Sequence, residues 1–417
     1  MNKKRIAVLF VLSGILIFQL CIFIIIKFSS ESSMASTPEP VLNINTTQKE
    51  SEILNAGIPD TTEIILNTEQ KIEALIENMT LEQKVGQMFF CAFRQDNAGN
   101  DIVEIDENIK NIIKDCGIGG VVLFSENIKD INQVTEYIRD LQNEAGITLF
   151  IGIDEEGGRV LRTDSLNVPR IASALSTGSS GDAQKAYDSA KTVAGYLKPL
   201  GFNLDFAPVA DVFTNPSNTV IGDRAFSTEP DTAAEMVKYF SQGLLDNGIL
   251  PVLKHFPGHG DTSEDSHYGT AITKKSLDEL YECEFIPFKT GIETNVPFVM
   301  AGHIATPNIN IENNNLPAIF SDFLLRDILR DKLGFNGIII TDSLSMGAII
   351  NYYTSEETAV KSILSGVDML LMPEDFNSAY HGVINAVKSG EIPEEQINGS
   401  VKRILAVKYE SGLIDLD

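Results

Sequence analysis

One stretch near the middle of this 417-residue chain concentrates groups that can transfer protons. It runs from Lys254 to His267 with the sequence KHFPGHGDTSEDSH, and it contains three of the five histidines. Its glycines and proline interrupt any helix or strand pattern, which predicts a loop. The apolar run at 249–253 is typical of a buried strand. A polar loop after such a strand is a common place for the chemistry of an α/β enzyme, and a solvated surface loop is the alternative.

Three residues are candidates for the catalytic steps. The pair Asp265 and His267 can form a carboxylate–imidazole couple, in which the acid orients the ring and stabilises its cation. Asp342 ends the apolar run GIIITD, and a carboxylate at a strand end can act as a nucleophile or as a base. The alternatives are two exposed loop residues for the first pair and a helix N-cap for Asp342.

Further polar residues follow other apolar runs. They are Asp154, Lys254, His255 and His303, with the arginines Arg162 and Arg224 on nearby loops. Carboxylates that accept and cations that donate charge-assisted hydrogen bonds together suit a polyhydroxyl ligand.

The elements that must position these residues alternate along the chain. Apolar runs predict strands at 88–93, 120–124, 149–154, 203–208, 250–255, 297–303, 337–342 and 369–372. Helical patterns lie at 105–114, 131–144, 183–200, 232–246, 277–294, 323–332, 356–365, 377–389 and 394–409. This α/β alternation favours a single (β/α)8 TIM-type barrel over residues 69–417, in which the strand ends converge on one face. A doubly wound open sheet also alternates and is the competing fold.

The N-terminus predicts a membrane anchor. A basic cluster, Lys3 to Arg5, precedes an apolar run over residues 6–26 that is long enough to span a bilayer, which places the remaining chain outside the cytoplasm. A signal peptide within residues 1–27 that is removed on secretion is the alternative. Residues 28–68 are rich in Ser, Thr, Glu and Pro, which predicts a flexible linker.

Composition excludes some partners. The formal net charge is −26, so the surface should repel nucleic acid, and we expect membrane contact only through the N-terminal segment. The four cysteines are scattered and suggest neither a disulfide framework nor a zinc knuckle. We expect no cofactor and no metal.

With these motifs in place, the chain resembles glycoside hydrolase family 3, and within it the NagZ-type bacterial β-N-acetylhexosaminidases. The similarity covers MTLEQKVGQM, IGIDEEGGRVLR, LDFAPVADV, IGDRAFS, KHFPGHGDTSEDSH and IIITDSLSM. The resemblance implies that Asp342 is the nucleophile, that His267 is the acid/base, and that Asp265 is its partner. It also implies that N-acetylglucosamine is held by Asp154, Arg162, Arg224, Lys254 and His255.

The resemblance implies hydrolysis with retention, through a covalent glycosyl-enzyme, of a cell-wall saccharide that bears terminal N-acetylglucosamine. Three alternatives stay open at this point. A phosphorylase could use the same scaffold, a metallohydrolase could use His255, His259, Asp261, Asp265 and His267, and a module without catalytic activity could bind cell wall.

Overall fold

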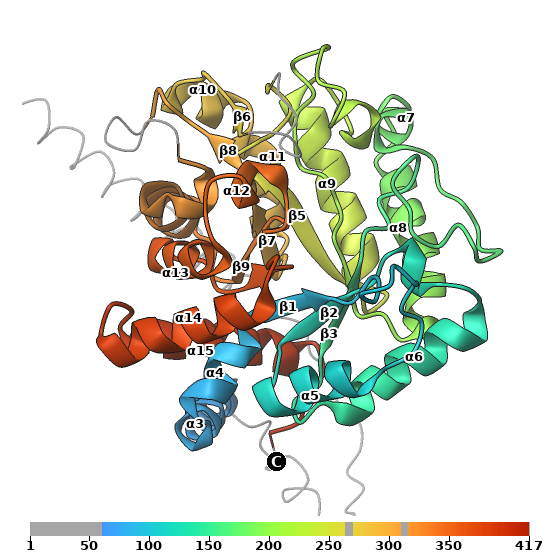
Figure 1. Cartoon of the computed structure of the whole chain (residues 1–417). Coiled ribbons are helices and arrows are strands. Elements are labelled where there is room, and N and C mark those ends of the chain that lie inside the picture. Colours follow the sequence, from blue (N-terminus) through green and yellow to red (C-terminus); the bar gives the residue numbers. More distant parts are fainter. Residues whose placement is uncertain (1–60, 263–269, 310–315, 417) are drawn as a thin grey trace, which may run out of the picture. The chain divides into compact units, whose positions relative to one another are not determined.

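Eight short parallel strands form the centre of the fold (Figure 1). The structure is a computed structural model that describes residues 61–262, 270–309 and 316–416. The strands are β1 (Phe89–Ala92), β2 (Gly120–Val122), β3 (Phe150–Ile153), β4 (Leu204–Asp205), β5 (Leu250–Phe256), β7 (Phe298–Ala301), β9 (Ile338–Thr341) and β10 (Leu370–Leu371). Their order in the sheet is β10-β1-β2-β3-β4-β5-β7-β9. All eight predicted strands are therefore confirmed, with shorter or slightly shifted ends.

The sheet curves until its two outer strands meet. A single parallel bridge joins Ile340 of β9 to Met369 beside β10. The N–H of Thr341 donates to the carbonyl of Met369 at 3.0 Å, and the N–H of Met369 donates to the carbonyl of Ile339 at 3.1 Å. The result is a nearly closed parallel α/β barrel, consistent with the TIM type and not with a doubly wound open sheet.

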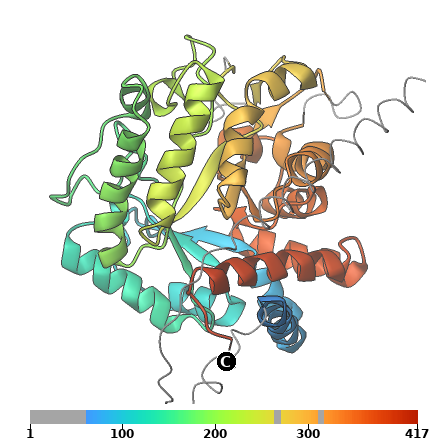
Figure 2. The same ribbon diagram turned by 180° about the vertical axis from the view of Figure 1, so that it is seen from behind.

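Helices surround these strands, as two opposite views show (Figures 1 and 2). Their bounds are α4 (Leu81–Gln87), α5 (Glu107–Cys116), α6 (Ile131–Glu144), α8 (Gln184–Leu200), α9 (Pro230–Leu245), α10 (Leu277–Glu282), α11 (Phe285–Glu293), η4 (Phe323–Lys332), α13 (Ser355–Ser365), α14 (Phe376–Ser389) and α15 (Glu394–Glu410). Short helices α7 (Ala174–Gly178) and α12 (Gly347–Ile350), and 3₁₀ turns η1 (Ser125–Asn127), η2 (Gly222–Arg224) and η3 (Ala318–Phe320), lie in the connections. The predicted helices are thus confirmed, with two differences in detail.

The first difference is a break in the helix predicted over 277–294. The structure has α10 and α11 there, separated at Cys283 and Glu284. Pro287 is the third residue of α11, and proline lacks the N–H that a continuing helix needs but is tolerated in a first turn. The second difference is that η4 is a π-helix, in which the N–H of Leu333 donates to the carbonyl of Ile328 at 2.9 Å.

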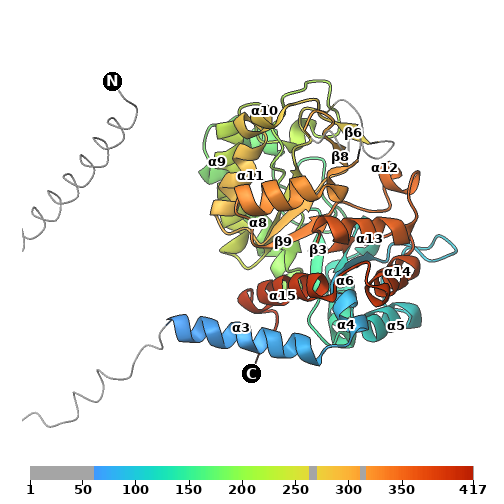
Figure 3. The same cartoon turned by 90° about the vertical axis from the view of Figure 1, so that its left-hand side faces the viewer.

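The linker predicted over 28–68 extends too far. Helix α3 (Thr61–Asn78) begins at Thr61, so residues 61–68 are helical. Ile72 and Ile76 lie one turn apart and are buried in the core, and a docked helix extends at little cost because propagation is cooperative. Lys402 of α15 also binds Glu73 of α3 at 2.9 Å. Figure 3 shows α3 and α15 at the end of the barrel opposite the two-stranded sheet of β6 (Ala271–Ile272) and β8 (Ile304–Ala305), which the sequence did not predict.

Aromatic rings fill the barrel interior. Phe90 and Phe206 pack edge to face with ring centres 5.4 Å apart, and Phe150 and Phe298 do so at 5.1 Å. Gly152 of β3 leaves room for the first pair, because a Cβ atom at this position would lie 2.8 Å from the Phe206 ring. This packing fixes the strands on which the polar residues stand.

The described part of the unit from Thr62 to Asp417 holds no helix that is both long and apolar enough to cross a membrane. The predicted anchor over residues 6–26 lies outside the described residues.

Candidate active site

A cavity of about 770 Å³ opens where the barrel strands end at their carboxyl side. Residues that follow β1, β2, β3, β4, β5, β9 and β10 line it, together with residues within β2, β5, β7 and β10. Its titratable lining residues are Arg94, Asp154, Glu156, Arg159, Arg162, Arg224, Lys254, His255, His259 and Asp342. A cavity of this size matches those that hold small organic ligands.

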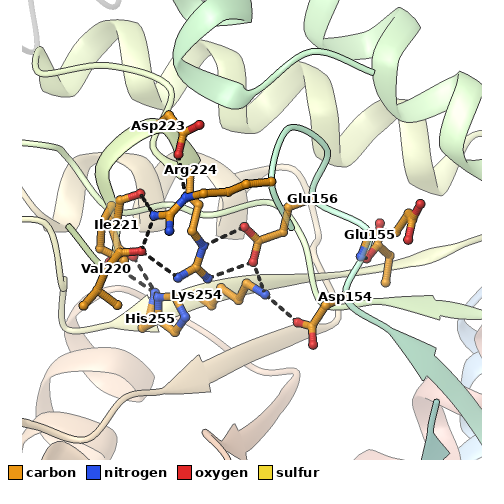
Figure 4. A network of polar contacts seen from close by, with 12 residues as sticks. Asp154, Glu155, Glu156, Val220, Ile221, Asp223, Arg224, Lys254 and His255 are labelled. Atoms are coloured by element: carbon orange, nitrogen blue, oxygen red, sulfur yellow. Dashed lines mark hydrogen bonds and ion pairs between the residues drawn. The ribbon is translucent and has the colours of Figure 1, made fainter. Parts of the chain in front are cut away.

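Lys254 organises one wall of the cavity (Figure 4). Its Nζ atom lies 2.8 Å from Oδ1 of Asp154 and 2.6 Å from Oε1 of Glu156. Glu156 in turn accepts two hydrogen bonds, both 2.8 Å long, from Nε and Nη2 of Arg224. Arg162 adds a second cation to Asp154, at 3.2 Å. The wall is therefore a continuous chain of alternating charges.

These contacts keep Asp154, Glu156 and Lys254 charged. Burial raises the pKa of Asp154, but Lys254 and Arg162 lower it by more, so the pKa lies below its ordinary value. The pKa of Glu156 is lowered in the same way, because the effect of Arg224 and Lys254 exceeds that of burial. Burial lowers the pKa of Lys254, and the two carboxylates raise it by more.

Glu155 faces away from the cavity and stabilises the loop between Asp154 and Arg162 through hydrogen bonds. One oxygen of Glu155 accepts from the backbone N–H of Arg162 at 2.8 Å. The other accepts from the hydroxyls of Thr163 and Tyr196, the latter at 2.9 Å. Arg162 also lies over the ring of Phe124, with 5.3 Å between its guanidinium carbon and the ring centre.

Asp211 fixes the beginning of the histidine-rich loop. It is fully buried and accepts from the Nδ1–H of His255 at 2.8 Å, and from the backbone N–H groups of His255 at 3.2 Å and of His259 at 2.7 Å. The His255 ring must therefore carry its proton on Nδ1, and Nε2 is the atom left for a ligand. Burial and the neighbouring His255 lower the pKa of His259, which favours its neutral form.

The loop continues as a stem that packs against residues 211–218. The side-chain amide of Asn218 donates to the carbonyl of His259 at 2.7 Å, and that of Asn215 donates to the carbonyl of Thr262 at 3.1 Å. A Cβ atom on Gly260 would lie 1.8 Å from the carbonyl oxygen of Val212, so only glycine fits there. Asp265 and His267 lie beyond this stem, outside the described residues.

Asp342 follows β9 on the same face and is partly exposed to the cavity. Its Oδ1 accepts from the N–H of Ser343 at 2.7 Å. Burial raises the pKa of Asp342, but His303, His255 and this N–H lower it by more, so the carboxyl is ionised at neutral pH. Within the described ranges, no cation lies close enough to Asp342 to form an ion pair. His303 donates from Nε2 to the carbonyl of Ser343 at 2.7 Å, which fixes the backbone beside Asp342.

The structure thus brings six of the eight predicted site residues to one cavity: Asp154, Arg162, Arg224, Lys254, His255 and Asp342. The sequence missed Glu156, Asp211 and Arg159 as members of the site. Glu156 and Arg159 lie in the quoted motif DEEGGRVLR. Each is a charged residue next to a glycine, and such glycines let the backbone come close to a ligand, so this pattern could have identified both residues. Of the proposed metal set, Asp265 and His267 lie outside the described residues, and the rest of the described chain has no group of three or more ligands arranged for a metal.

Several known proteins are similar to this chain in sequence or structure over most of its length. A β-hexosaminidase A of Pseudoalteromonas piscicida is 29% identical over 79% of this chain and 61% of its own length. A β-hexosaminidase LpqI of Mycobacterium tuberculosis is 32% identical over 71% of this chain and 77% of its own. Among solved structures, a family 3 β-N-acetylglucosaminidase of a Paenibacillus strain superposes with a TM-score of 0.76 at 34% identity, and covers 80% of this chain and 63% of that one. The chain therefore spans less than two thirds of two of these relatives.

The model of the glycosyl hydrolase family 3 N terminal domain matches residues 80–407, which include all eight barrel strands and every charged group of the cavity. The chain belongs to glycosyl hydrolase family 3.

Proposed function

We propose that this protein is a retaining β-N-acetylglucosaminidase. The names of its relatives support this activity, since they are called β-hexosaminidases and a β-N-acetylglucosaminidase. The observation that carries the proposal is that two walls of the cavity differ in their ion pairing. One wall is a chain of ion-paired donors and acceptors, and the other presents Asp342, an ionised carboxylate with no cation bound to it among the described residues.

In the proposed reaction, Asp342 attacks the anomeric carbon and the glycosidic bond breaks. His267 gives its proton to the leaving oxygen, and Asp265 stabilises the imidazolium before the transfer. A covalent glycosyl-enzyme forms on an Oδ atom of Asp342. Water then attacks the anomeric carbon, His267 accepts its proton, and Asp342 is released as a carboxylate. The lowered pKa of Asp342 suits the nucleophile, which must be ionised at the start.

The paired wall holds the sugar in this proposal. Asp154 accepts from hydroxyls, whereas Arg162, Arg224 and Lys254 donate to oxygens, and His255 offers Nε2. The charged groups are already paired within the wall, and His255 is paired with Asp211. They are therefore fixed before the ligand arrives, and little free energy is lost in ordering them.

We place the substrate among cell-wall saccharides that end in N-acetylglucosamine. An anchor over residues 6–26, or a secreted form after removal of residues 1–27, would bring the barrel to such a substrate outside the cytoplasm. Residues 28–60 would then act as the spacer. Mass spectrometry of the mature N-terminus distinguishes an anchored from a cleaved form.

Hydrolysis of two aryl glycosides tests the activity. The purified protein should release the phenol from an aryl N-acetyl-β-glucosaminide and act much more slowly on the aryl β-glucoside. In phosphate buffer the product should be free N-acetylglucosamine, and a sugar phosphate would indicate a phosphorylase instead. Release of phenol from neither substrate would contradict the proposal.

The nucleophile is tested by Asp342→Ala. Turnover should fall at least about 10³-fold, as for other residues that form the covalent bond. The matched control is Asp327→Asn, an exposed aspartate on η4 that should leave turnover unchanged. In the wild type, a fluorinated substrate that forms the intermediate faster than water removes it should label the peptide with Asp342. Labelling of another carboxylate would disprove the assignment.

A further inference from the structure

Arg159 lines the cavity but is not among the residues assigned to the sugar. It stands at the tip of a tight turn, in which Gly157 and Val160 exchange two backbone hydrogen bonds of 3.1 Å. Gly158, the other tip residue, has φ +58°, and a Cβ atom on it would lie 2.7 Å from Cβ of Ser173. The backbone of the turn is therefore fixed, and with it the point from which the Arg159 side chain extends.

The guanidinium of Arg159 reaches across to the loop that follows β4. Its Nη2 donates to three successive carbonyl oxygens, those of Thr219 at 2.9 Å, Val220 at 2.8 Å and Ile221 at 3.1 Å. Its Nε donates to Oδ1 of Asp223 at 2.7 Å. One half-exposed side chain thus binds four acceptors within five consecutive residues.

These acceptors belong to the turn that carries Arg224 (Figure 4). The carbonyl of Val220 is shared, because it also accepts from Nη1 of Arg224 at 3.2 Å. The backbone N–H of Arg224 donates to the carbonyl of Ile221 at 2.9 Å. A movement of residues 219–223 would therefore move the guanidinium that pairs with Glu156 and faces the cavity.

We infer that Arg159 is a positioning residue, which fastens the loop after β3 to the loop after β4 and so sets the Arg224 guanidinium in place for the ligand. The inference rests on the proposed function for the part that concerns the sugar. Arginine is required for this role, because its planar fork presents several N–H groups in fixed directions, whereas the ammonium of lysine is a point donor.

Hydrogen exchange on the full chain without ligand tests the fastening itself. In Arg159→Ala, peptides that cover residues 218–225 should exchange faster than in the wild type, while peptides from β1 and β2 should not change. Arg170→Ala is the matched control, because Arg170 is an exposed arginine paired with Asp164 and lies outside the cavity lining. Unchanged exchange over 218–225 would overturn the inference.

A double-mutant cycle tests the effect on the sugar. Arg159→Ala should raise KM for the aryl N-acetyl-β-glucosaminide about tenfold, the loss expected when one charged hydrogen bond is weakened, and should change kcat less. Arg159→Lys should recover only part of this loss. If Arg159 acts through Arg224, then Arg159→Ala should add little in a protein that already carries Arg224→Ala. Effects that multiply would mean that Arg159 contacts the sugar itself, and would overturn the inference.

The two experiments separate this inference from the proposed function. If the wild type hydrolyses neither aryl glycoside but exchange over 218–225 still responds to Arg159→Ala, the proposed function fails and the fastening stands. If the wild type is active and Arg159→Ala changes neither exchange nor KM, the inference fails alone.

Discussion

Two lysines are buried at opposite ends of this barrel, and their surroundings differ. Lys254, at the cavity, lies between the carboxylates of Asp154 and Glu156. Lys408, in α15, is fully buried, donates to Oε1 of Gln87 at 2.8 Å, and lies 4.9 Å from the centre of the Phe150 ring. No carboxylate within the described chain forms an ion pair with it.

The pKa values follow from this difference. The carboxylates hold the pKa of Lys254 above its ordinary value, whereas burial alone lowers the pKa of Lys408 to about 7. The comparison indicates that Asp154 and Glu156 stabilise the charged form of Lys254, which is therefore available to a ligand in the cavity. Among the described residues no carboxylate pairs with Lys408, so its charge can be lost without breaking an ion pair.

The largest effect is expected from Lys254→Met. It leaves two buried carboxylates without their shared cation, which should cost about 3–5 kcal/mol of unfolding free energy. We also expect kcat/KM to fall, by about 10²-fold or more. The measurements are urea unfolding and hydrolysis of the aryl N-acetyl-β-glucosaminide. Lys388→Met is the control, since Lys388 pairs at the surface with Glu82. If both variants lost the same unfolding free energy and the same kcat/KM, the ion pairs of the cavity would not differ from those at the surface.

Glu156→Gln should have the next largest effect. The substitution keeps the shape but removes the one anion that Lys254 and Arg224 share, so we expect KM to rise about tenfold or more.

Glu156 also predicts that the stability of the fold depends on pH in the acidic range. Because its folded pKa lies below its unfolded value of 4.5, the ionised residue stabilises the fold above that value, and this stability is lost as the pH falls. Unfolding measured from pH 7 to pH 3 should therefore show a shallower decline for Glu156→Gln than for the wild type. Parallel curves would contradict the role of Glu156.

Lys408 predicts a dependence of stability on pH in the alkaline range. Its folded pKa of about 7 lies below the ordinary value of 10.5, so between these values the unfolded chain binds a proton that the folded chain does not. Its contribution to stability should therefore rise with pH from about 7 to about 10, by up to about 4 kcal/mol. The measured quantity is the difference between the unfolding free energies of the wild type and of Lys408→Met across this range. A constant difference would mean that Lys408 keeps an ordinary pKa.

The smallest effect should be that of Lys408→Met on catalysis. Since Lys408 lies at the end of the barrel away from the cavity lining, kcat and KM at pH 7 should stay within about twofold of the wild type. A larger loss of activity would show that the two ends are coupled.

The same contrast shows what the sequence could predict. The strands were predictable because each is a short apolar run, and Asp154, Lys254 and Asp342 were recognisable because they end such runs within specific motifs. Lys408 gave no signal, because a lysine near the end of an amphipathic helix is usually exposed. Asp211 sits among apolar residues in LDFAPVADV, and only the fold brings it to His255. Contacts between loops distant in sequence, such as Arg159 with residues 219–223, depend on tertiary packing that no local pattern encodes.

The stem of the histidine-rich loop has a consequence for protein engineering. Gly260 touches the Val212 carbonyl so closely that no side chain fits, and Asn215 and Asn218 bind the carbonyls of residues 259 and 262. A designer who grafts this loop onto another barrel of the family must therefore transplant segment 211–218 with it, because the two segments form one exchangeable cassette. Swapping the loop alone would leave the grafted backbone with unmatched polar groups and a steric clash at its base.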